Sequence, residues 1–204
     1  NWNSLYTWDL GFISWAFAMY DPVKAFETIR AYTTEEESQS AFIHHGTPLP
    51  MQFFAFEQLC SEYWDDEAIL YLYPRLKRYY DYITGKDATA TSVMSSDFLA
   101  TWDYWYSTGG WDDYPVMHYL RLNPHLYKSV APMVTSSYYI RAGKILRMIA
   151  RHYGMKADEK QYDEDIRRFT KPILESGWDE QAGYFGYVTH DQNGKPNGFM
   201  KYED

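Results

Sequence analysis

The chain has 204 residues, of which 46% are hydrophobic and 23% charged, and both fractions are close to globular averages. These fractions exclude a disordered chain. The longest apolar-rich stretch, residues 10–20, is too short to span a bilayer. The net charge of −9 argues against nucleic acid as a ligand, because phosphate binding needs a basic face. A neutral or basic ligand is easier to accommodate.

Six helices are predicted in chain order, and they pair into three helical hairpins. Apolar residues recur at helical spacing, and Gly or Asp-Pro signals separate the segments. Asp9 is predicted to cap the first helix, and Pro74 is predicted to kink the fourth helix or to mark a join within it. The predicted helices cover residues 10–20, 21–32, 51–63, a segment ending near residue 83, 132–153 and 158–175.

Residues 86–128 interrupt this helical pattern and show no sustained period. A segment of this length without regular structure in a compact domain is usually functional. A free-standing six-helix bundle is the alternative, but its loops would normally be shorter. Three hairpins of two helices are half of a twelve-helix toroid, and the long segment favours that interpretation.

The C-terminal tail, residues 183–200, is predicted to form a β-hairpin around Asn193-Gly194. Asp191 and Asn193 resemble part of a calcium loop, but the spacing places Pro196 where the turn glycine belongs. A plain hairpin is therefore preferred. This small β element is expected at the end of an otherwise all-α chain.

Aromatic residues make up 20% of the chain, and the excess comes from 21 Tyr and 8 Trp. These rings have an apolar face and a polar edge. A sugar ring likewise has an apolar C–H face and hydroxyl edges, so a cleft rich in Trp and Tyr suits a carbohydrate. A Tyr-rich core or surface is the alternative that composition leaves open.

Neither cysteine nor histidine indicates a metal site. Cys60, the single cysteine, cannot form an intrachain disulfide, has no nearby metal-ligand spacing and lies on an apolar helical stripe, so we expect it to be buried. His44 and His45 are adjacent but have no third ligand nearby, which favours polar loop residues. We expect no metal and no cofactor. No signal peptide is visible, and the sequence does not indicate the cellular compartment of the protein.

The strongest local signal is a pair of adjacent carboxylates, Asp112 and Asp113, between Trp111 and Tyr114 in the long irregular segment. Neighbouring side chains point in different directions, so one carboxylate can face a ligand while the other holds the loop. Aromatic surroundings and a second carboxylate would raise the pKa of an acid here, as a proton donor near neutral pH requires. An Asp-rich turn that caps a helix is the structural alternative.

Residues 110–115, Gly-Trp-Asp-Asp-Tyr-Pro, resemble the Gly-x-Asp-Asp-Tyr-Pro signature of glycoside hydrolase family 63, the processing α-glucosidase I family. In that family the first Asp is the general acid. An Arg commonly follows the Pro there, whereas Val116 stands here. Residues 6–12 are similar to the Trp-Asp-x-Gly-Phe segment of the same family and to the Trp-Asp segment of trehalases, and residues 44–50 match a Pro-containing loop by position.

The resemblance implies an (α/α)6 toroid and inverting, exo-acting, α-glucosidase-like hydrolysis of an oligosaccharide. It implies Asp112 as the catalytic acid. The family's base is a Glu in the C-terminal half of the toroid, so we expect residues 1–204 to be part of one catalytic domain, its N-terminal half, with the base and the remainder outside this sequence. Within this sequence, Glu57 and Glu203 are the only fallback candidates for the catalytic base. The implied substrate-binding residues are Trp8, Asp9, Phe12, Trp111, Asp113 and Tyr114.

A second candidate acid is Asp179, because residues 175–179, Glu-Ser-Gly-Trp-Asp, resemble the catalytic segment of trehalases. This segment ends a predicted helix and leads into the β-hairpin, which favours a structural role. Two other function classes stay open. A carbohydrate-binding or scaffold protein could keep the aromatic pocket without turnover. A polysaccharide lyase or an unsaturated-uronide hydrolase would handle anionic sugars, but there is no Lys or Arg between Asp97 and Met117.

Overall fold

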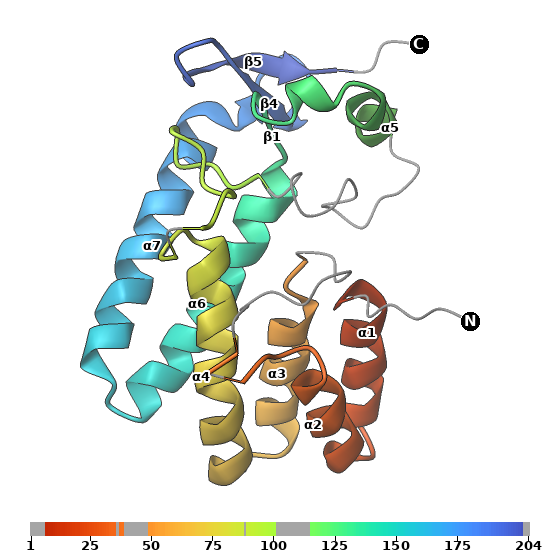
Figure 1. Ribbon diagram of the computed structural model, residues 1–204, viewed down its shortest axis with the longest axis vertical. Helices are drawn as coiled ribbons and strands as arrows, with labels where there is room; N and C mark the ends of the chain where they lie inside the picture. Colours follow the sequence, from red (N-terminus) through yellow and green to blue (C-terminus); the bar gives the residue numbers. More distant parts are fainter. Residues whose placement is uncertain (1–6, 36, 39–48, 88, 101–114, 202–204) are drawn as a thin grey trace.

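The computed structural model describes residues 7–35, 37–38, 49–87, 89–100 and 115–201. Helices dominate this part of the chain, and short strands gather near its C-terminal end (Figure 1). The helices are α1 (Thr7–Ala18), α2 (Pro22–Arg30), α3 (Met51–Glu62), α4 (Asp66–Ile83), α5 (Pro115–Leu122), the 3-10 helix η1 (Pro124–Leu126), α6 (Met133–His152) and α7 (Lys156–Ser176). The strands are β1 (Val130–Ala131), β2 (Trp178–Asp179), β3 (Tyr184–Phe185), β4 (Tyr187–His190) and β5 (Pro196–Met200).

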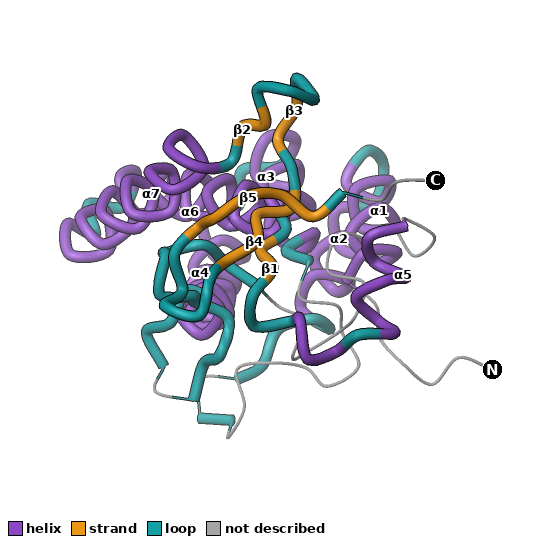
Figure 2. The backbone as a smooth tube through the Cα atoms, turned by 90° about the horizontal axis from the view of Figure 1, so that it is seen from above, coloured by secondary structure: helices purple, strands orange, loops and turns teal. Residues whose placement is uncertain are grey.

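The three predicted hairpins are confirmed as α1–α2, α3–α4 and α6–α7, and they form two layers. The inner layer consists of α1, α3 and α6, which follow one another across the view from above (Figure 2). Within it, α3 packs against α1 on one side and against α6 on the other. The outer helix α2 packs against α1 and α3, α4 packs against α6, and α7 packs along α6. The hairpins therefore stack side by side as an arc.

The three inner helices begin at the same end of the molecule and run in the same direction (Figure 1). The prediction that Asp9 caps the first helix is wrong, because α1 already begins at Thr7 and Asp9 lies in its first turn. An acidic side chain in a first turn still interacts favourably with the helix dipole. Asp9 is therefore placed at the end of the bundle where all three inner helices start.

Helices α1 and α3 approach each other closely because α1 has a glycine at the contact. A Cβ atom added to Gly11 would lie 2.3 Å from the Cβ of Met51, the first residue of α3. One turn further along α1, the Ser14 hydroxyl donates a hydrogen bond to the Ala25 carbonyl of α2 at 3.1 Å. Small residues on α1 thus fix its position against both neighbours.

Replacing Gly11 by Ala tests this contact, because two effects of opposite sign compete. Helix propensity alone would stabilise the protein by about 0.5–1 kcal/mol. The clash with Met51 is expected to win and to destabilise it by about 1–3 kcal/mol, as overpacking does. Urea unfolding gives the sign directly, and a more stable Gly11→Ala variant would show that α1 can move away from α3 at little cost.

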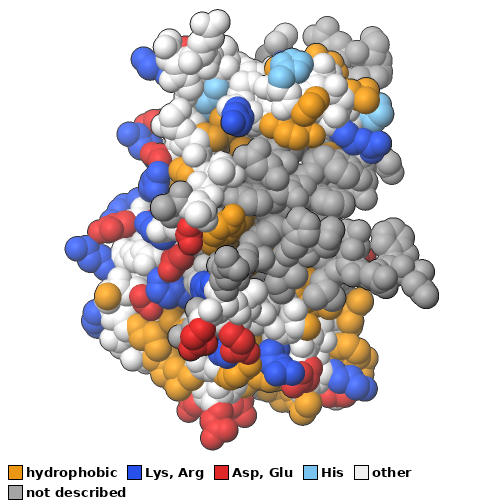
Figure 3. All heavy atoms as spheres, viewed as in Figure 1, with side chains coloured by type: hydrophobic (Ala, Val, Ile, Leu, Met, Phe, Trp, Pro, Cys, Tyr) orange, Lys and Arg blue, Asp and Glu red, His pale blue; other side chains and the backbone are white. Residues whose placement is uncertain are grey.

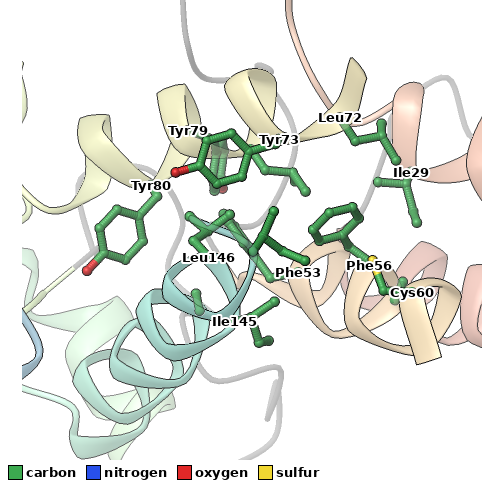
Figure 4. Packing of buried hydrophobic residues seen from close by; sticks show 14 of the residues in the cluster. Ile29, Phe53, Phe56, Cys60, Leu72, Tyr73, Tyr79, Tyr80, Ile145 and Leu146 are labelled. Atoms are coloured by element: carbon green, nitrogen blue, oxygen red, sulfur yellow. The ribbon is translucent and has the colours of Figure 1, made fainter. Parts of the chain in front are cut away.

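A continuous core lies between the layers, and most of its side chains come from α2, α3, α4, α6 and α7, while α1 contributes Ala18 (Figure 4). Phe53 and Phe56 of α3 point toward α4, where the ring of Tyr79 lies 6.2 Å from that of Phe53. Cys60 is buried, as predicted, and burial raises the pKa of its thiol to about 12. Pro74 lies inside α4, which runs as one helix from Asp66 to Ile83, so Pro74 does not mark a join between two helices.

A small antiparallel sheet covers the end of the bundle where α6 begins (Figure 1). Its strand order is β1-β4-β5, and β1 leads through Pro132 directly into α6. The predicted hairpin around Asn193-Gly194 is β4–β5. The Asp191 side chain accepts hydrogen bonds from the backbone N–H groups of Asn193 and Lys195, at 2.8 and 2.9 Å, which closes the hairpin turn.

The prediction of irregular structure over residues 86–128 is wrong at its C-terminal end. Residues 115–122 form α5, which buries Val116, Met117 and Leu120 against β1. The 3-10 helix η1 follows. An element of two turns, with Pro residues near both ends, is too short for a helical period to stand out from its surroundings.

Candidate active site

The described candidate residues Trp8, Asp9 and Phe12 lie on the first turns of α1. Trp8 is half-buried, Asp9 is exposed, and the Phe12 side chain is 46% exposed. The ring of Phe12 meets that of Trp8 edge-on at 5.0 Å and stacks on Trp15 at 6.4 Å, with 12° between the ring planes. Asp9 forms no ion pair with any described residue. A carboxylate thus stands beside a row of accessible aromatic rings.

The other candidates, Trp111, Asp112, Asp113 and Tyr114, lie outside the described residues, as do His44, His45 and Glu203. The described residues on either side of segment 101–114 are both held at the end where α6 begins. On one side, the Leu99 N–H donates to the Ser136 hydroxyl of α6 at 2.9 Å. On the other side, α5 packs against β1.

Val116 is a core residue in this protein. Its side chain is 4% exposed and packs in a cluster with Met117, Leu120 and Val130. In the family that residues 110–115 resemble, an Arg commonly stands at this position. An Arg here would have to bury its charge among these apolar side chains, which is costly without a partner. Val116, where this sequence differs from that family's motif, therefore serves the apolar packing of α5 onto the sheet.

Asp179, the alternative acid, is held as a carboxylate. Its side chain is buried, lies 2.8 Å from the Lys201 ammonium, and accepts hydrogen bonds from the backbone N–H groups of Gln181 and Ala182 at 3.0 and 3.1 Å. The Lys201 ammonium, 2.8 Å from the carboxylate, lowers the pKa of Asp179, with help from those N–H groups. An acid with a lowered pKa has no proton to give near neutral pH. The role of Asp179 seen here is structural, because its hydrogen bonds close the β2–β3 turn.

This geometry predicts a pH-dependent role for Asp179 in stability. Because its folded pKa is below the ordinary 3.8, the stabilisation is present above pH 3.8 and is lost as the pH falls through the folded pKa. Asp179→Asn is expected to lower the melting temperature at neutral pH, with the difference from wild type shrinking below about pH 4. Glu180→Gln, the same charge change on an exposed neighbour, is the control. A difference that stays constant with pH would contradict this assignment.

Glu57, the described fallback for the catalytic base, is paired with a cation. Its two carboxylate oxygens accept hydrogen bonds from the Arg141 guanidinium of α6 at 2.6 and 2.7 Å. One turn closer to the candidate site, the rings of Phe54 and Tyr138 meet edge-on at 5.7 Å. Sequence analysis missed this α3–α6 seam, because no local motif relates residues that are 84 positions apart in the chain.

The fold and these positions define an arc of helical hairpins of the kind found in (α/α)6 toroids. No protein-family model and no curated protein matches the sequence. Among solved structures, the chain is similar to the GH63 mannosylglycerate hydrolase from Thermus thermophilus in complex with glucose, with a TM-score of 0.59 and 16% sequence identity. The match covers 93% of this chain and 60% of the hydrolase chain, and at this identity it shows the fold alone.

None of the described helices is long and apolar enough to cross a membrane.

Proposed function

We propose that this chain forms part of the catalytic domain of an inverting glycoside hydrolase, with Asp112 as the general acid. The observation that carries the proposal is the toroid-type fold, in which Trp8, Asp9 and Phe12 lie at the end where the inner helices begin. Asp112 precedes Pro115, the first residue of α5, by three positions in the sequence. Together these residues would line one sugar pocket.

In this mechanism Asp112 protonates the glycosidic oxygen as the bond to the anomeric carbon breaks. A second carboxylate takes a proton from water, which attacks the opposite face of the sugar and inverts its configuration. The two carboxyl groups must lie about 6.5–9.5 Å apart to leave room for that water. We propose, as the resemblance implies, that this base comes from the remainder of the toroid, since Glu57, the described fallback for the base, is paired with Arg141.

Aromatic rings and the other carboxylates would hold the substrate in place. Trp8, Phe12, Trp111 and Tyr114 offer apolar faces to the C–H face of a sugar, while Asp9 and Asp113 accept hydrogen bonds from its hydroxyl groups. The resembling motifs make an exo-acting α-glucosidase-like activity on an oligosaccharide the specific proposal. The solved neighbour acts on mannosylglycerate, which makes that compound a necessary member of any substrate test.

The test is an activity panel with the complete protein. It uses α-linked glucose disaccharides, mannosylglycerate, α-mannosides and trehalose, and NMR of the first-formed anomer reports inversion or retention. Release of glucose with inversion is the expected result. Sugar binding by calorimetry without any turnover would favour the non-catalytic carbohydrate-binding alternative, and retention of configuration would overturn the two-carboxylate mechanism.

A further inference from the structure

A groove opens at the end of the bundle where α1 and α3 terminate, opposite the candidate sugar site (Figure 1). It lies between the start of α2, the last turn of α3 and the first turns of α4. Its volume is about 640 Å³. Small-molecule sites typically measure about 300–1,000 Å³, so the groove is large enough for a ligand. The lining residues that define its chemistry are Val23, Phe26, Tyr63, Trp64, Asp65 and Glu67.

Trp64 forms a fixed wall of this groove. Its indole N–H donates a hydrogen bond to the Asp66 carboxylate at 3.1 Å, and the Tyr153 hydroxyl donates to the same oxygen. The ring of Trp64 also meets that of His152 edge-on, with 4.6 Å between the ring centres. Although it is held against the end of α6 in this way, the Trp64 side chain is 46% exposed. A side chain that is already held in place loses little conformational freedom when a ligand binds.

The lining of the groove carries negative charge. Asp65 and Glu67 contribute carboxylates, and no Lys or Arg is present among the described residues that line it. Asp65 accepts the Ala68 N–H with one oxygen at 2.9 Å and so caps α4, while its second oxygen has no partner in the described part of the chain. Acidic and hydrophobic side chains lie next to one another at this end of the molecule (Figure 3).

The basic side chains that flank the lining are already paired. Lys24, Arg30 and Arg75 follow lining residues by one or four positions, and each pairs with an acidic residue outside the lining. The Arg75 guanidinium also lies 3.7 Å from the centre of the Tyr71 ring and covers that face of it. These three cations therefore leave the two lining carboxylates without a counter-charge.

We propose that this groove binds an organic cation that carries an ammonium group on an apolar body. The accessible rings of Tyr63 and Trp64 attract a cation through their π faces. The two carboxylates provide complementary charge, and Val23 and Phe26 provide apolar surface for the remainder of the ligand. The site would be separate from the sugar pocket and rests on no catalytic step.

The hydrogen-bonding capacity of the lining favours a cation over a sugar. An ammonium group donates hydrogen bonds and accepts none, whereas sugar hydroxyls do both. The Trp64 N–H is occupied by Asp66, and the Tyr71 hydroxyl faces Glu35 at 3.5 Å. Tyr63 is then the remaining side-chain donor among the described lining residues. The groove thus offers mainly acceptors and aromatic faces, which suit a ligand that only donates.

The experiment compares three probes on the complete protein at neutral pH. They are hexylammonium, its neutral analogue 1-hexanol, and maltose, and NMR titration gives each dissociation constant. Hexylammonium is expected to bind at least about 10-fold more tightly than 1-hexanol, because the alcohol lacks the attraction to rings and carboxylates. Equal affinities, or no binding of hexylammonium, would overturn the proposal. Maltose that displaces hexylammonium at equal or lower concentration would assign the groove to a carbohydrate instead.

A double variant, Asp65→Asn with Glu67→Gln, shows where the cation binds. Asn is as good an N-cap as Asp, so α4 keeps its cap. Hexylammonium affinity should fall by about 10-fold while 1-hexanol affinity stays unchanged. Glu164→Gln with Glu180→Gln is the matched control, since it removes two exposed acids outside the groove and should change the affinity less than about 2-fold.

Equal losses in the two double variants would show a general attraction to the net charge of −9 and would overturn the proposal. Hexylammonium binding that persists unchanged in the lining variant would do the same, because the cation would then bind elsewhere. Circular dichroism shows that each variant folds. No substrate is turned over in these titrations, so their outcome is independent of whether the protein hydrolyses sugars.

Discussion

Replacing Asp112 by Asn in the complete enzyme is expected to reduce turnover by about 10²–10⁴-fold, which is the usual contribution of general acid catalysis. Asn is nearly isosteric with Asp and keeps its hydrogen-bonding capacity, but it has no proton to give the leaving oxygen. Steady-state kinetics on the best substrate of the panel measure the effect, and circular dichroism shows that the variant folds.

The leaving group separates the acid role from a merely structural one. If Asp112 protonates the leaving oxygen, Asp112→Asn should slow poor leaving groups most, and an activated aryl glycoside or a glycosyl fluoride should recover part of the rate. Asp113→Asn is the matched neighbour and should reduce all rates alike, since it acts through positioning. Should Asp179→Asn give the leaving-group-dependent loss instead, the acid would be Asp179 and the proposed site would be wrong.

Replacing Phe56 by Ala is expected to destabilise the protein by about 3–5 kcal/mol, because the substitution removes a large ring and leaves a cavity that the core can only partly close. The Phe56 side chain is fully buried between α3 and the outer layer (Figure 4). Chemical unfolding measured at one temperature gives the change in free energy. The large loss is expected because this core holds the inner helices in register.

Phe185→Ala is the control for this prediction. Phe185 lies on β3 with its side chain 49% exposed and meets Trp178 edge-on at 5.1 Å. Its replacement should cost less than about 1 kcal/mol, as for most surface positions. Similar losses for the two Phe variants would mean that the hairpin aromatics are as important for stability as the interlayer core, contrary to the burial seen here.

The sequence by itself determined the helical hairpins and the C-terminal β-hairpin. Amphipathic periodicity is local, so helices such as α6 and α7 could be placed within one or two residues of their observed ends. Asn193-Gly194 specified the turn between β4 and β5 for the same reason. The motifs around Asp9 and Asp112 also identified a candidate site, although only its α1 residues fall within the described structure.

Only the tertiary structure decided which side of each element meets a partner. The sequence of α1 has no amphipathic pattern, so it could not show that small residues face α3 while Phe12, Ile13 and Met19 face outward. The same holds for Val116, whose burial depends on β1, and for Asp179, whose pKa is lowered by Lys201, 22 positions away. Burial and charge pairing arise from residues distant in the chain, and no local pattern encodes them.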